Sequence, residues 1–392
     1  MVSRSNPRIS AAFEASRAVR GTRRTAGTWT NPTITYQVEN ASFPGQDSPL
    51  GLDKETSAFA MLPLEPAYQL RPRIARASAE VRAADADLRT TRRDMTLQAV
   101  AAFYSTALAH VEVAGLEDNR AWLDSLIRYA GARVKEGAAA EVDLIRLEVE
   151  RDRAETDLAL ARVDLARSRS ILASLIGSNN FEIDVATAAR PEISGRSLPD
   201  LQLALTTAGR LRPEISAAQA RLDAASSGVS VERSSIVRYL GLMTGLKTTA
   251  GTRSMMTGLS FSLPLFNQNH GEIQRAQAER RIAAFDRESA ERMVTADVTA
   301  TFAAVETLSA QLARMQDGLI RRAEEARRIA EGAYREGATP LTQVIDAARA
   351  LAEARQLYYR ALFARAQAVI ELSSSLGTLD NNQPPLLDRS VR

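Results

Sequence analysis

Cysteine is absent from the 392 residues of the chain. Its absence excludes disulfides and thiolate metal sites, and it leaves no N-terminal Cys for lipid attachment in this chain. Histidine is scarce as well: His110 and His270 lie far apart, and neither has a partner at metal-ligand spacing. No nucleophile elbow, P-loop, zinc-binding helix motif or Rossmann fingerprint occurs. The sequence therefore predicts no enzyme, no resident metal and no cofactor.

Aromatic residues make up only 5% of the chain, which is thin for globular cores of this size. Ala, Leu, Arg and Glu dominate, and these residues favour long helices that pack through narrow apolar stripes. An excess of charge of one sign is missing too, because the 50 basic and 47 acidic residues are interspersed and leave a net charge of +3. This pattern gives poor support to a nucleic-acid partner.

Long apolar runs are also lacking. No segment approaches the roughly 18 to 20 consecutive apolar residues of a membrane-spanning helix. The first residues, MVSRSNPRIS, lack the apolar core of a signal peptide. Taken alone, these two absences indicate a soluble protein, but the strand-like segments indicate the opposite.

The chain repeats itself. RVKEGAAAEVDLI at 133–145 corresponds to AYREGATPLTQVI at 333–345, which places Gly337 two hundred residues after Gly137 (337 − 137 = 200). Further pairs are SLIG with SSLG, LPL at 62–64 with LPL at 263–265, and NPRISAA with RPEISAA. The spacing drifts between these pairs, as loops of unequal length would produce in a tandem duplication.

Each half contains one predicted β-hairpin. Residues 33–39, TITYQVE, alternate apolar and polar side chains with the period of a strand, and a second strand follows at about 56–64. In the second half, segments at 238–246 and 254–265 flank a short loop. Strands of about 9 to 10 residues cross a bilayer when tilted, but four of them cannot close a barrel. Several chains must therefore contribute strands to one barrel.

The predicted helices are much longer than those of globular domains. Residues 71–136 would span roughly 100 Å at 1.5 Å per residue, and residues 269–336 are similar. Each then turns at its Gly into a helix of about 40 residues, roughly 60 Å long. Leu158, Leu165 and Leu172 recur every seven residues, as Leu362, Val369 and Leu376 do later. This spacing predicts coiled-coil seams with small residues beside them.

The predicted fold is mainly α with a small β part, built from internally duplicated long antiparallel helical hairpins and two β-hairpins. The expected segments are a truncated N-terminal helix (1–30), a first transmembrane β-hairpin (31–65), a first long helical hairpin with its tip turn near 137 (66–177), an equatorial segment (178–200), a helix (201–235), a second transmembrane β-hairpin (236–265), a second long helical hairpin with its tip turn near 337 (266–377) and a C-terminal tail (378–392).

These features together resemble the TolC-like outer-membrane efflux channel family, and more closely its heavy-metal cation efflux branch. The resemblance covers nearly the whole chain and rests on NPTITYQVEN entering the first strand, LPLFNQNHGEIQRAQAE leaving the second hairpin, and both Gly turns. It implies a homotrimer whose twelve strands form a barrel in the outer membrane of a Gram-negative-type cell, in contact with lipid. The helices would form an α-barrel across the periplasm. Its tip would meet a periplasmic adaptor (membrane fusion) protein, linked to an inner-membrane efflux pump of the RND type.

The resemblance also assigns roles to the turns. The family pattern at the tip is Arg, three residues, Gly, and Asp six positions after the Gly. The first turn keeps this pattern as Arg133, Gly137 and Asp143, whereas the second has Ala333, Gly337 and Gln343. We expect both glycines to adopt positive φ and their neighbours to dock the adaptor, although helix C-capping alone would also require glycine there.

A second expectation concerns Asp346. The family narrows its tip with carboxylates six and nine residues after the second Gly, and this chain keeps the later one as Asp346, with Gln343 at the earlier position. Three Asp346 side chains would form an acidic ring that attracts cations and holds the gate through neighbouring Arg residues. The alternative is an exposed helix carboxylate in an ordinary ion pair.

Other hypotheses stay open at this point. His270 is expected at a loop or helix start, and Met255 and Met256 are expected to face opposite sides of a strand. The cargo could be metal cations or small toxic solutes, and a metal cargo rests on the resemblance alone. A duct for type I protein secretion and a soluble coiled-coil scaffold are the alternatives. The second half has about fifteen residues, LPDLQLALTTAGRLR, before its PEIS, against five before NPRIS, which suggests that this chain begins late.

Overall fold

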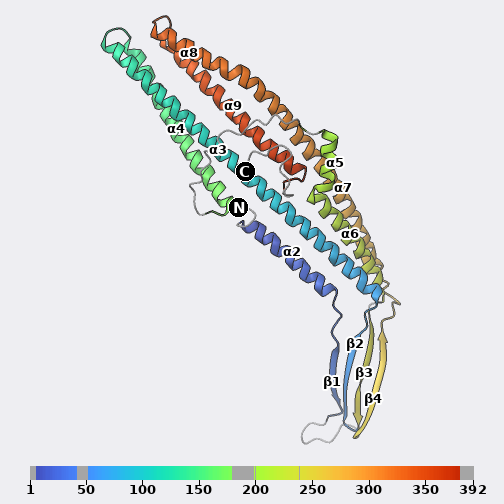
Figure 1. Ribbon diagram of the computed structural model, residues 1–392. Coiled ribbons are helices and arrows are strands. Elements are labelled where there is room, and N and C mark those ends of the chain that lie inside the picture. The colour runs from blue at the N-terminus through green and yellow to red at the C-terminus, as the bar shows by residue number, and fades with distance from the viewer. Residues whose placement is uncertain (1–5, 42–51, 179–197, 199, 238, 380–392) are drawn as a thin grey trace. The chain divides into compact units, whose positions relative to one another are not determined.

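A computed structural model describes residues 6–41, 52–178, 198, 200–237 and 239–379 (Figure 1). Most of the expected equatorial segment and C-terminal tail therefore lies outside the described residues. The chain divides into two compact units. Unit 1 comprises Met1–Ala12, Arg89–Pro213 and Glu291–Arg392, and unit 2 comprises Phe13–Leu88 and Glu214–Ala290. Each unit draws on both halves of the duplicated sequence.

The described elements confirm the fold class, since long helices accompany one four-stranded antiparallel sheet. The helices are α2 (Pro7–Ala26), α3 (Ala67–Lys135), α4 (Glu141–Ile176), α5 (Leu201–Leu211), α6 (Pro213–Ser234), α7 (His270–Arg314), the π-helical segment η3 (Met315–Ile320), α8 (Arg321–Arg335) and α9 (Leu341–Ser375). The strands are β1 (Thr33–Glu39), β2 (Glu55–Pro63), β3 (Leu240–Thr249) and β4 (Thr252–Phe261).

The sheet belongs to unit 2 and has the order β1-β2-β3-β4. The two β-hairpins are joined through β2 and β3, whose register runs from Glu55 opposite Thr249 to Pro63 opposite Gly241. Because side chains alternate along each strand, this register places all the large exposed apolar residues of the strands on one face. They are Ile34, Tyr36, Val38, Leu62, Leu246, Met255, Leu259 and Phe261.

The opposite face of the sheet is mainly polar. It carries the threonine and glutamine side chains of β1, serines of β2 and β4, and an ion pair between Lys247 Nζ and Glu55 Oε2 at 2.6 Å. An apolar face against a polar face is the pattern of a strand pair that lies between lipid and water. Four bulky side chains on this polar face depart from the pattern: Phe59, Met61, Met243 and Met256.

Unit 1 is held together by the predicted seams. Leu158 and Leu165 of α4 are buried with Val113 of α3. Leu172 is buried with Ala107 of α3 and Phe363 of α9. The seam of the second half is confirmed in the same way, because Leu362, Val369 and Leu376 are all buried.

The helical part of unit 2 packs through alanine. The nearly inaccessible side chains of its helices are mostly this residue: Ala77, Ala79, Ala83, Ala86, Ala217, Ala218, Ala220, Ala224 and Ala276. Ion pairs flank these contacts, with Arg82 bonded to Asp223 at 2.9 Å and Arg221 bonded to Asp87 at 2.7 Å. Small side chains let helix backbones approach closely, so this packing explains how so few aromatic residues suffice.

Two helices differ from the sequence prediction. The expected helix over 201–235 is broken into α5 and α6 at Arg212, which adopts an extended backbone (φ −67°, ψ 122°). The physical cause is Pro213, which disfavours the helical conformation of the residue before it and has no N–H to continue the hydrogen bonds. The long helix of the second half contains the π-helical turn η3, for which periodicity gives no signal.

The apolar content of α3 is higher than the sequence analysis recognised. Among the described helices, α3 contains an 18-residue stretch that is apolar enough to cross a membrane by length and composition. A single stretch of this kind is weak evidence, since a core helix passes the same test. In α3 the apolar side chains from Ala102 to Val111 pack around Ala107, Leu172 and Phe363.

Candidate functional site

The two Gly turns of unit 1 have the same backbone geometry. Gly137 has φ +73° and Gly337 has φ +77°. In the first turn Gly137 N–H donates to Val134 O at 3.0 Å and Ala138 N–H donates to Arg133 O at 2.8 Å. These two bonds define a Schellman motif, and the second turn repeats them at the equivalent positions with the same two distances. The predicted positive φ is therefore confirmed at both turns, and glycine adopts it with less strain than any other residue.

The helices that follow the turns begin without a side-chain cap. Ala140 and Pro340 occupy the N-cap positions of α4 and α9 with extended backbones. The first turn of α4 carries Glu141 and Asp143, whereas that of α9 carries no acidic residue. Carboxylates at a helix N-terminus are favoured by the helix dipole, so Asp143 stabilises the start of α4 in a way that Gln343 cannot reproduce for α9.

Both turns expose the same short sequence. Lys135, Glu136, Gly137 and Ala138 are exposed, and so are residues 335–338, which read Arg, Glu, Gly and Ala. A Cβ atom added to either glycine would meet nothing within 4 Å, so the turn tips are open on their outer side. The chain thus presents the same small, mixed-charge surface twice.

A shared apolar cluster lies beneath the two turns and connects them. It contains buried residues from α3, α4, α8 and α9: Leu123, Leu126, Ala130, Leu147, Ala154, Tyr334, Leu341, Val344 and Ile345. Both helical hairpins contribute to this one core, so the turns are positioned by packing rather than by the turn loops themselves.

Arg133 lies against two tyrosines that sequence reasoning missed. Its guanidinium carbon is 5.9 Å from the ring centre of Tyr129 and 6.0 Å from that of Tyr334, and the two rings contact each other edge to face at 6.3 Å. The Nη2 of Arg133 also donates to Ala138 O at 3.1 Å within its own turn. Cation–π contacts of this kind are worth roughly 0.5 to 2 kcal/mol each. Arg133 therefore joins the first turn to Tyr334 of the second hairpin.

Tyr334 is 5% exposed, and its hydroxyl has no hydrogen-bond partner among the described residues. Burial raises the pKa of Tyr334 above its usual value of 10.0, and the negative charge of Asp143 raises that pKa further. The positive charge of Arg133 acts in the opposite direction, and Tyr129 adds a smaller upward effect. Charges of the first turn therefore change the pKa of a buried side chain of the second hairpin.

The predicted gate residue Asp346 lies on α9 with its side chain 74% exposed. Its carboxylate is 3.9 Å from Arg349, at the long limit of an ion pair. Arg349 also binds Glu150 of α4, through Nη2 to Oε1 and through Nε to Oε2 at 3.3 Å. Gln343 is exposed on the same helix. The structure therefore brings Arg133 and Asp143 together with Tyr334, while Gln343 and Asp346 lie on exposed positions.

The remaining sequence candidates lie elsewhere. His270 begins α7 and its Nε2 is 3.1 Å from Gln268 Oε1, as expected for a helix-start residue. Met255 and Met256 lie on opposite faces of β4, also as expected. Within the described ranges, no group of three or more His, Cys, Asp or Glu residues could hold a metal ion.

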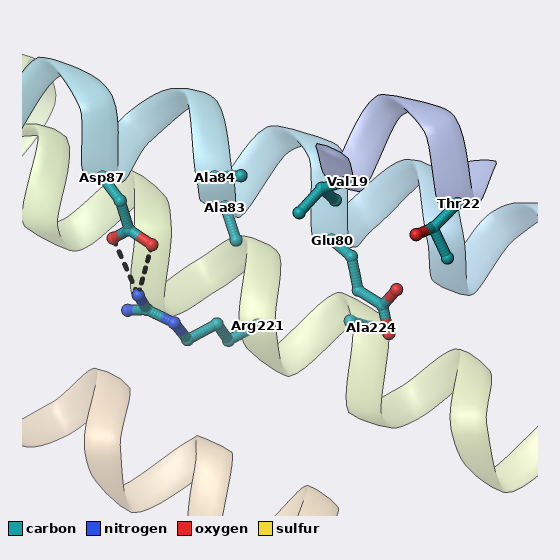
Figure 2. Close-up of a pocket in the computed structure, with 8 residues that line it drawn as sticks. All are labelled: Val19, Thr22, Glu80, Ala83, Ala84, Asp87, Arg221 and Ala224. Atoms are coloured by element: carbon teal, nitrogen blue, oxygen red, sulfur yellow. Dashed lines mark hydrogen bonds and ion pairs between the residues drawn. The ribbon is translucent and has the colours of Figure 1, made fainter. Parts of the chain in front are cut away.

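A cavity of about 330 Å³ in unit 2 is lined by residues of α2, α3 and α6 (Figure 2). The lining is Val19, Thr22, Glu80, Ala83, Ala84, Asp87, Arg221 and Ala224. Figure 2 shows Arg221 directed at Asp87, and their atoms are 2.7 Å apart. Glu80 is bonded to Arg76 at 3.0 Å. Because Asp87 pairs with Arg221 and Glu80 pairs with Arg76, the cavity is a gap between alanine-lined helices rather than a ligand site.

Comparisons with known proteins agree with this architecture. The model of a family described as outer membrane efflux protein matches residues 204–378. The cobalt-zinc-cadmium resistance protein CzcC of Cupriavidus metallidurans is 26% identical over 329 residues, which are 83% of this chain and 77% of that protein. The outer membrane efflux protein BepC of Brucella suis is 24% identical over 263 residues, which are 64% of this chain but only 56% of BepC.

Two solved structures share the fold. The structure of CusC, described in terms of folding and transmembrane channel formation, has a TM-score of 0.82 at 17% identity and covers 96% of this chain and 90% of CusC. The outer-membrane channel OprN has a TM-score of 0.80 at 20% identity and covers 96% of this chain and 88% of OprN. At these identities the likeness shows the fold.

The charges around Tyr334 predict how its ionisation responds to substitution. Asp143→Asn should lower the pKa of Tyr334 toward its usual value, and Arg133→Gln should raise it, because each removes one of the two opposing charges. The measurement is the ultraviolet absorbance of phenolate against pH, with Tyr334→Phe subtracted to isolate this residue. Because folding raises the pKa of Tyr334, its neutral hydroxyl form contributes to the stability of the folded chain. This contribution is complete below the usual pKa of 10.0 and is lost as the pH rises through the pKa of the folded state.

The matched control is Arg128→Gln, which removes a charge from an exposed position of the same helix that does not act on Tyr334. It should leave the difference titration unchanged. If the pKa of Tyr334 is unchanged in both Asp143→Asn and Arg133→Gln, the two turns are not coupled through this side chain.

Proposed function

The chain belongs to the outer membrane efflux protein family, and from this membership we propose that it is the outer-membrane exit duct of a tripartite efflux system. The duct would pass metal cations or small toxic solutes from an inner-membrane pump of the RND type and a periplasmic adaptor protein to the outside. Family members are channels rather than enzymes. The proposal is carried by one observation, the four-stranded sheet with an exposed apolar face and a polar face.

The apolar face of the sheet supports an outer-membrane location. Its eight large side chains are exposed in the chain and would face lipid in a barrel. Exposed aromatic residues flank the strands, with Trp29 before β1, Tyr68 after β2 and Phe266 after β4. Aromatic side chains are enriched at both membrane–water boundaries, so these three residues are suited to mark the periplasmic boundary of the barrel.

The edges of the sheet support a homotrimer. In the described part of the chain, β1 pairs with β2 and β4 pairs with β3, which leaves the other side of each outer strand for another chain. Four strands from each of three chains would give an even-numbered barrel of twelve, within the range of bacterial outer-membrane barrels. In such a barrel the polar face would line the lumen.

The paired turns support docking of the periplasmic adaptor. Each chain presents the exposed Lys/Arg-Glu-Gly-Ala surface twice with one backbone geometry, so a trimer would present six nearly equivalent surfaces. Six copies of one adaptor surface could bind such a ring with the same contacts. We assign docking to the turns that contain Arg133, Gly137, Asp143, Gly337 and Gln343.

The exposure of Asp346 supports a gate role. A carboxylate on an exposed position of α9, five residues after the apolar cluster residue Leu341 and beside Arg349, is available to a neighbouring chain. Three copies around a symmetry axis would form an acidic ring that favours cations. Opening would then compete with the Arg349–Glu150 pair that ties α9 to α4 within one chain.

The names of the relatives support small cargo over protein cargo. CzcC is named for resistance to cobalt, zinc and cadmium, and OpmQ of Pseudomonas putida, 27% identical over 262 residues, is named for pyoverdine export. A soluble coiled-coil scaffold would explain the helical seams but gives no reason for the apolar face of the sheet. We therefore prefer the efflux duct to a secretion duct or a scaffold.

The first test is the native mass of the refolded chain in detergent and in plain buffer, followed by conductance in a planar bilayer. We expect a trimer that requires detergent and conducts ions, because the apolar sheet face needs an apolar environment. A stable monomer or dimer in plain buffer would mean that the hairpins do not insert, and the scaffold would then be the better interpretation.

The docking proposal predicts opposite outcomes for two substitutions of Gly137. Gly137→Asn should keep efflux, because Asn tolerates positive φ and nothing stands within 4 Å of an added Cβ. Gly137→Pro should abolish efflux while the trimer still assembles, because Pro fixes φ near −65° and cannot form this turn. Efflux and trimer mass are measured for both variants, and full efflux by Gly137→Pro would remove the docking role.

The gate proposal predicts that Asp346→Ala changes the channel and that Asp346→Glu does not. Loss of three carboxylates should lower the preference for cations over anions and alter single-channel conductance, whereas Glu keeps the charge. Both quantities are measured in the same bilayer at one salt concentration. If Asp346→Ala matches the original channel in both, Asp346 is an ordinary exposed carboxylate.

A further inference from the structure

Two basic residues lie on the apolar face of the sheet, at the end where loops join the strands of each hairpin. Arg253 of β4 pairs with Thr248 of β3, and Thr248 pairs with Thr56 of β2, so these three side chains form one row across that face. Lys54 directly precedes β2, and the alternation of the strand places it on the same face as Thr56, nearer to the loop. Lys54 and Arg253 are both exposed. The apolar face therefore ends in two exposed positive charges.

This row follows the apolar part of the face. Its neighbours in the previous row are Leu246 and Met255, and the far end of the face carries Leu240 opposite Phe261. The strand advances eight residues from Leu240 to Thr248 (248 − 240 = 8), which is about 27 Å of tilted strand. The apolar band of an outer-membrane barrel is about 25 Å tall, so the row lies near the level at which hydrocarbon gives way to headgroups. Long basic side chains at this level can extend their charges out of the hydrocarbon.

The charges on the opposite face are of mixed sign and are paired within the sheet. Glu39 of β1 lies directly opposite Glu55 of β2, and Lys247 Nζ lies 2.6 Å from Glu55 Oε2. Lys54 and Arg253 differ, because neither takes part in an ion pair among the described residues. At this end the carboxylates of the strands thus lie on the polar face, and the apolar face offers two positive charges to an anion outside the chain.

We propose that Lys54 and Arg253 bind the phosphate groups of lipid headgroups in the leaflet that faces outside. The guanidinium of Arg253 suits a phosphate through two parallel hydrogen bonds, and the ammonium of Lys54 attracts one as a point charge. The hydroxyls of Thr56 and Thr248 are further donors in the same row. Because β2 and β4 are two strands apart, or about 10 Å, each basic residue would hold a separate phosphate.

The neighbouring apolar side chains favour a lipid over a soluble anion. Leu246 and Met255, one row away from Arg253, are 57% and 76% exposed. A lipid has an acyl chain for these side chains and a phosphate for the adjacent charges, whereas a soluble anion would contact the charges alone. Anionic headgroups also attract Lys and Arg that lie near a membrane surface.

The choice of leaflet rests on the proposed function. The strands join the helices at their other end, where α6 precedes β3 and β2 leads into α3. If the helices cross the periplasm, as in the proposed duct, the end that carries Lys54 and Arg253 faces outside. Phosphate binding there would fix how deep the barrel lies in the membrane. The preference for a phosphate-bearing lipid itself depends only on the register of β2, β3 and β4.

The test is a titration of the full chain in uncharged detergent micelles with phosphatidic acid and, in parallel, with phosphatidylcholine that has the same acyl chains. Bound lipid is counted by native mass spectrometry. We expect the original chain to bind phosphatidic acid more tightly than phosphatidylcholine. This preference should fall about fivefold in Arg253→Gln and about fivefold again when Lys54→Gln is added, as expected for each charge lost near an anionic surface. Arg253→Lys keeps the charge and should retain most of the preference.

The matched control is Lys247→Gln, which removes one positive charge at nearly the same height from the opposite face of the sheet. It should bind both lipids as the original chain does. All the variants change exposed or half-exposed polar positions, so they should fold. A preference that falls equally in Lys247→Gln would reflect net charge alone and overturns the proposal. Sodium phosphate should displace phosphatidic acid no better than sodium chloride at the same ionic strength, and better displacement would identify a site for a free anion instead of a lipid.

The outcome is separable from that of the duct, which is tested by trimer mass and conductance. A preference for phosphatidic acid that is lost in Arg253→Gln and kept in Lys247→Gln supports the headgroup site whether or not the chain conducts ions. Equal binding of the two lipids by the original chain overturns the site even if the trimer and its conductance are as expected.

Discussion

The backbone N–H and C=O groups along the outer sides of β1 and β4 need hydrogen-bond partners, and much of the structure follows from this need. In hydrocarbon each unsatisfied group costs several kcal/mol, and no water is present to replace a missing strand. A four-stranded sheet with an apolar face can therefore enter a membrane only when other chains complete it. For a sheet inserted in a membrane, self-association would thus be a condition of the fold rather than an addition to it.

The same condition explains the helices of each unit. Apolar side chains remain exposed on α4 at Val142, Ile145, Val149, Leu160, Val163 and Ile171, and on α7 at Ile282, Phe285 and Met293. A helix with one buried apolar stripe and a second apolar stripe that is exposed has a surface suited to packing against a further partner. If the strands of several chains share one barrel, their helices are brought together at high local concentration, and these stripes gain that partner. Exposed apolar residues on the helices and the open sheet edges are then two consequences of one assembly.

Periodicity in the sequence predicted most of the helices and strands. Features that depend on tertiary contacts could not be predicted in this way. The strand at 33–39 and the seam of Leu158, Leu165 and Leu172 were predictable because alternation and heptad spacing are local signals. The break at Arg212 had a local signal in Pro213 that the continuous helical pattern obscured. Nothing local marks Tyr334, whose importance comes from Tyr129 and Arg133 a long way off in sequence. The order of the two hairpins in the sheet is likewise a long-range property.

The duplication kept the backbone of the two halves and let their chemistry diverge. Both turns close with the same Schellman bonds, yet the position of Arg133 is Ala333 in the second half, and that of Asp143 is Gln343. The first turn therefore contributes the charges, and the second contributes the buried Tyr334 on which they act.

A further difference lies in the helices that lead to the turns. Among the described residues, the helix before the second turn contains the π segment η3, whereas α3 is α-helical throughout Ala67–Lys135. A π turn shifts the side-chain stripe by one position, so the two hairpins can share one apolar cluster without presenting identical surfaces. The turns have the same backbone, whereas only the second hairpin supplies Asp346. Under the proposed roles, the repeated turn would serve docking and the difference between the hairpins would serve gating.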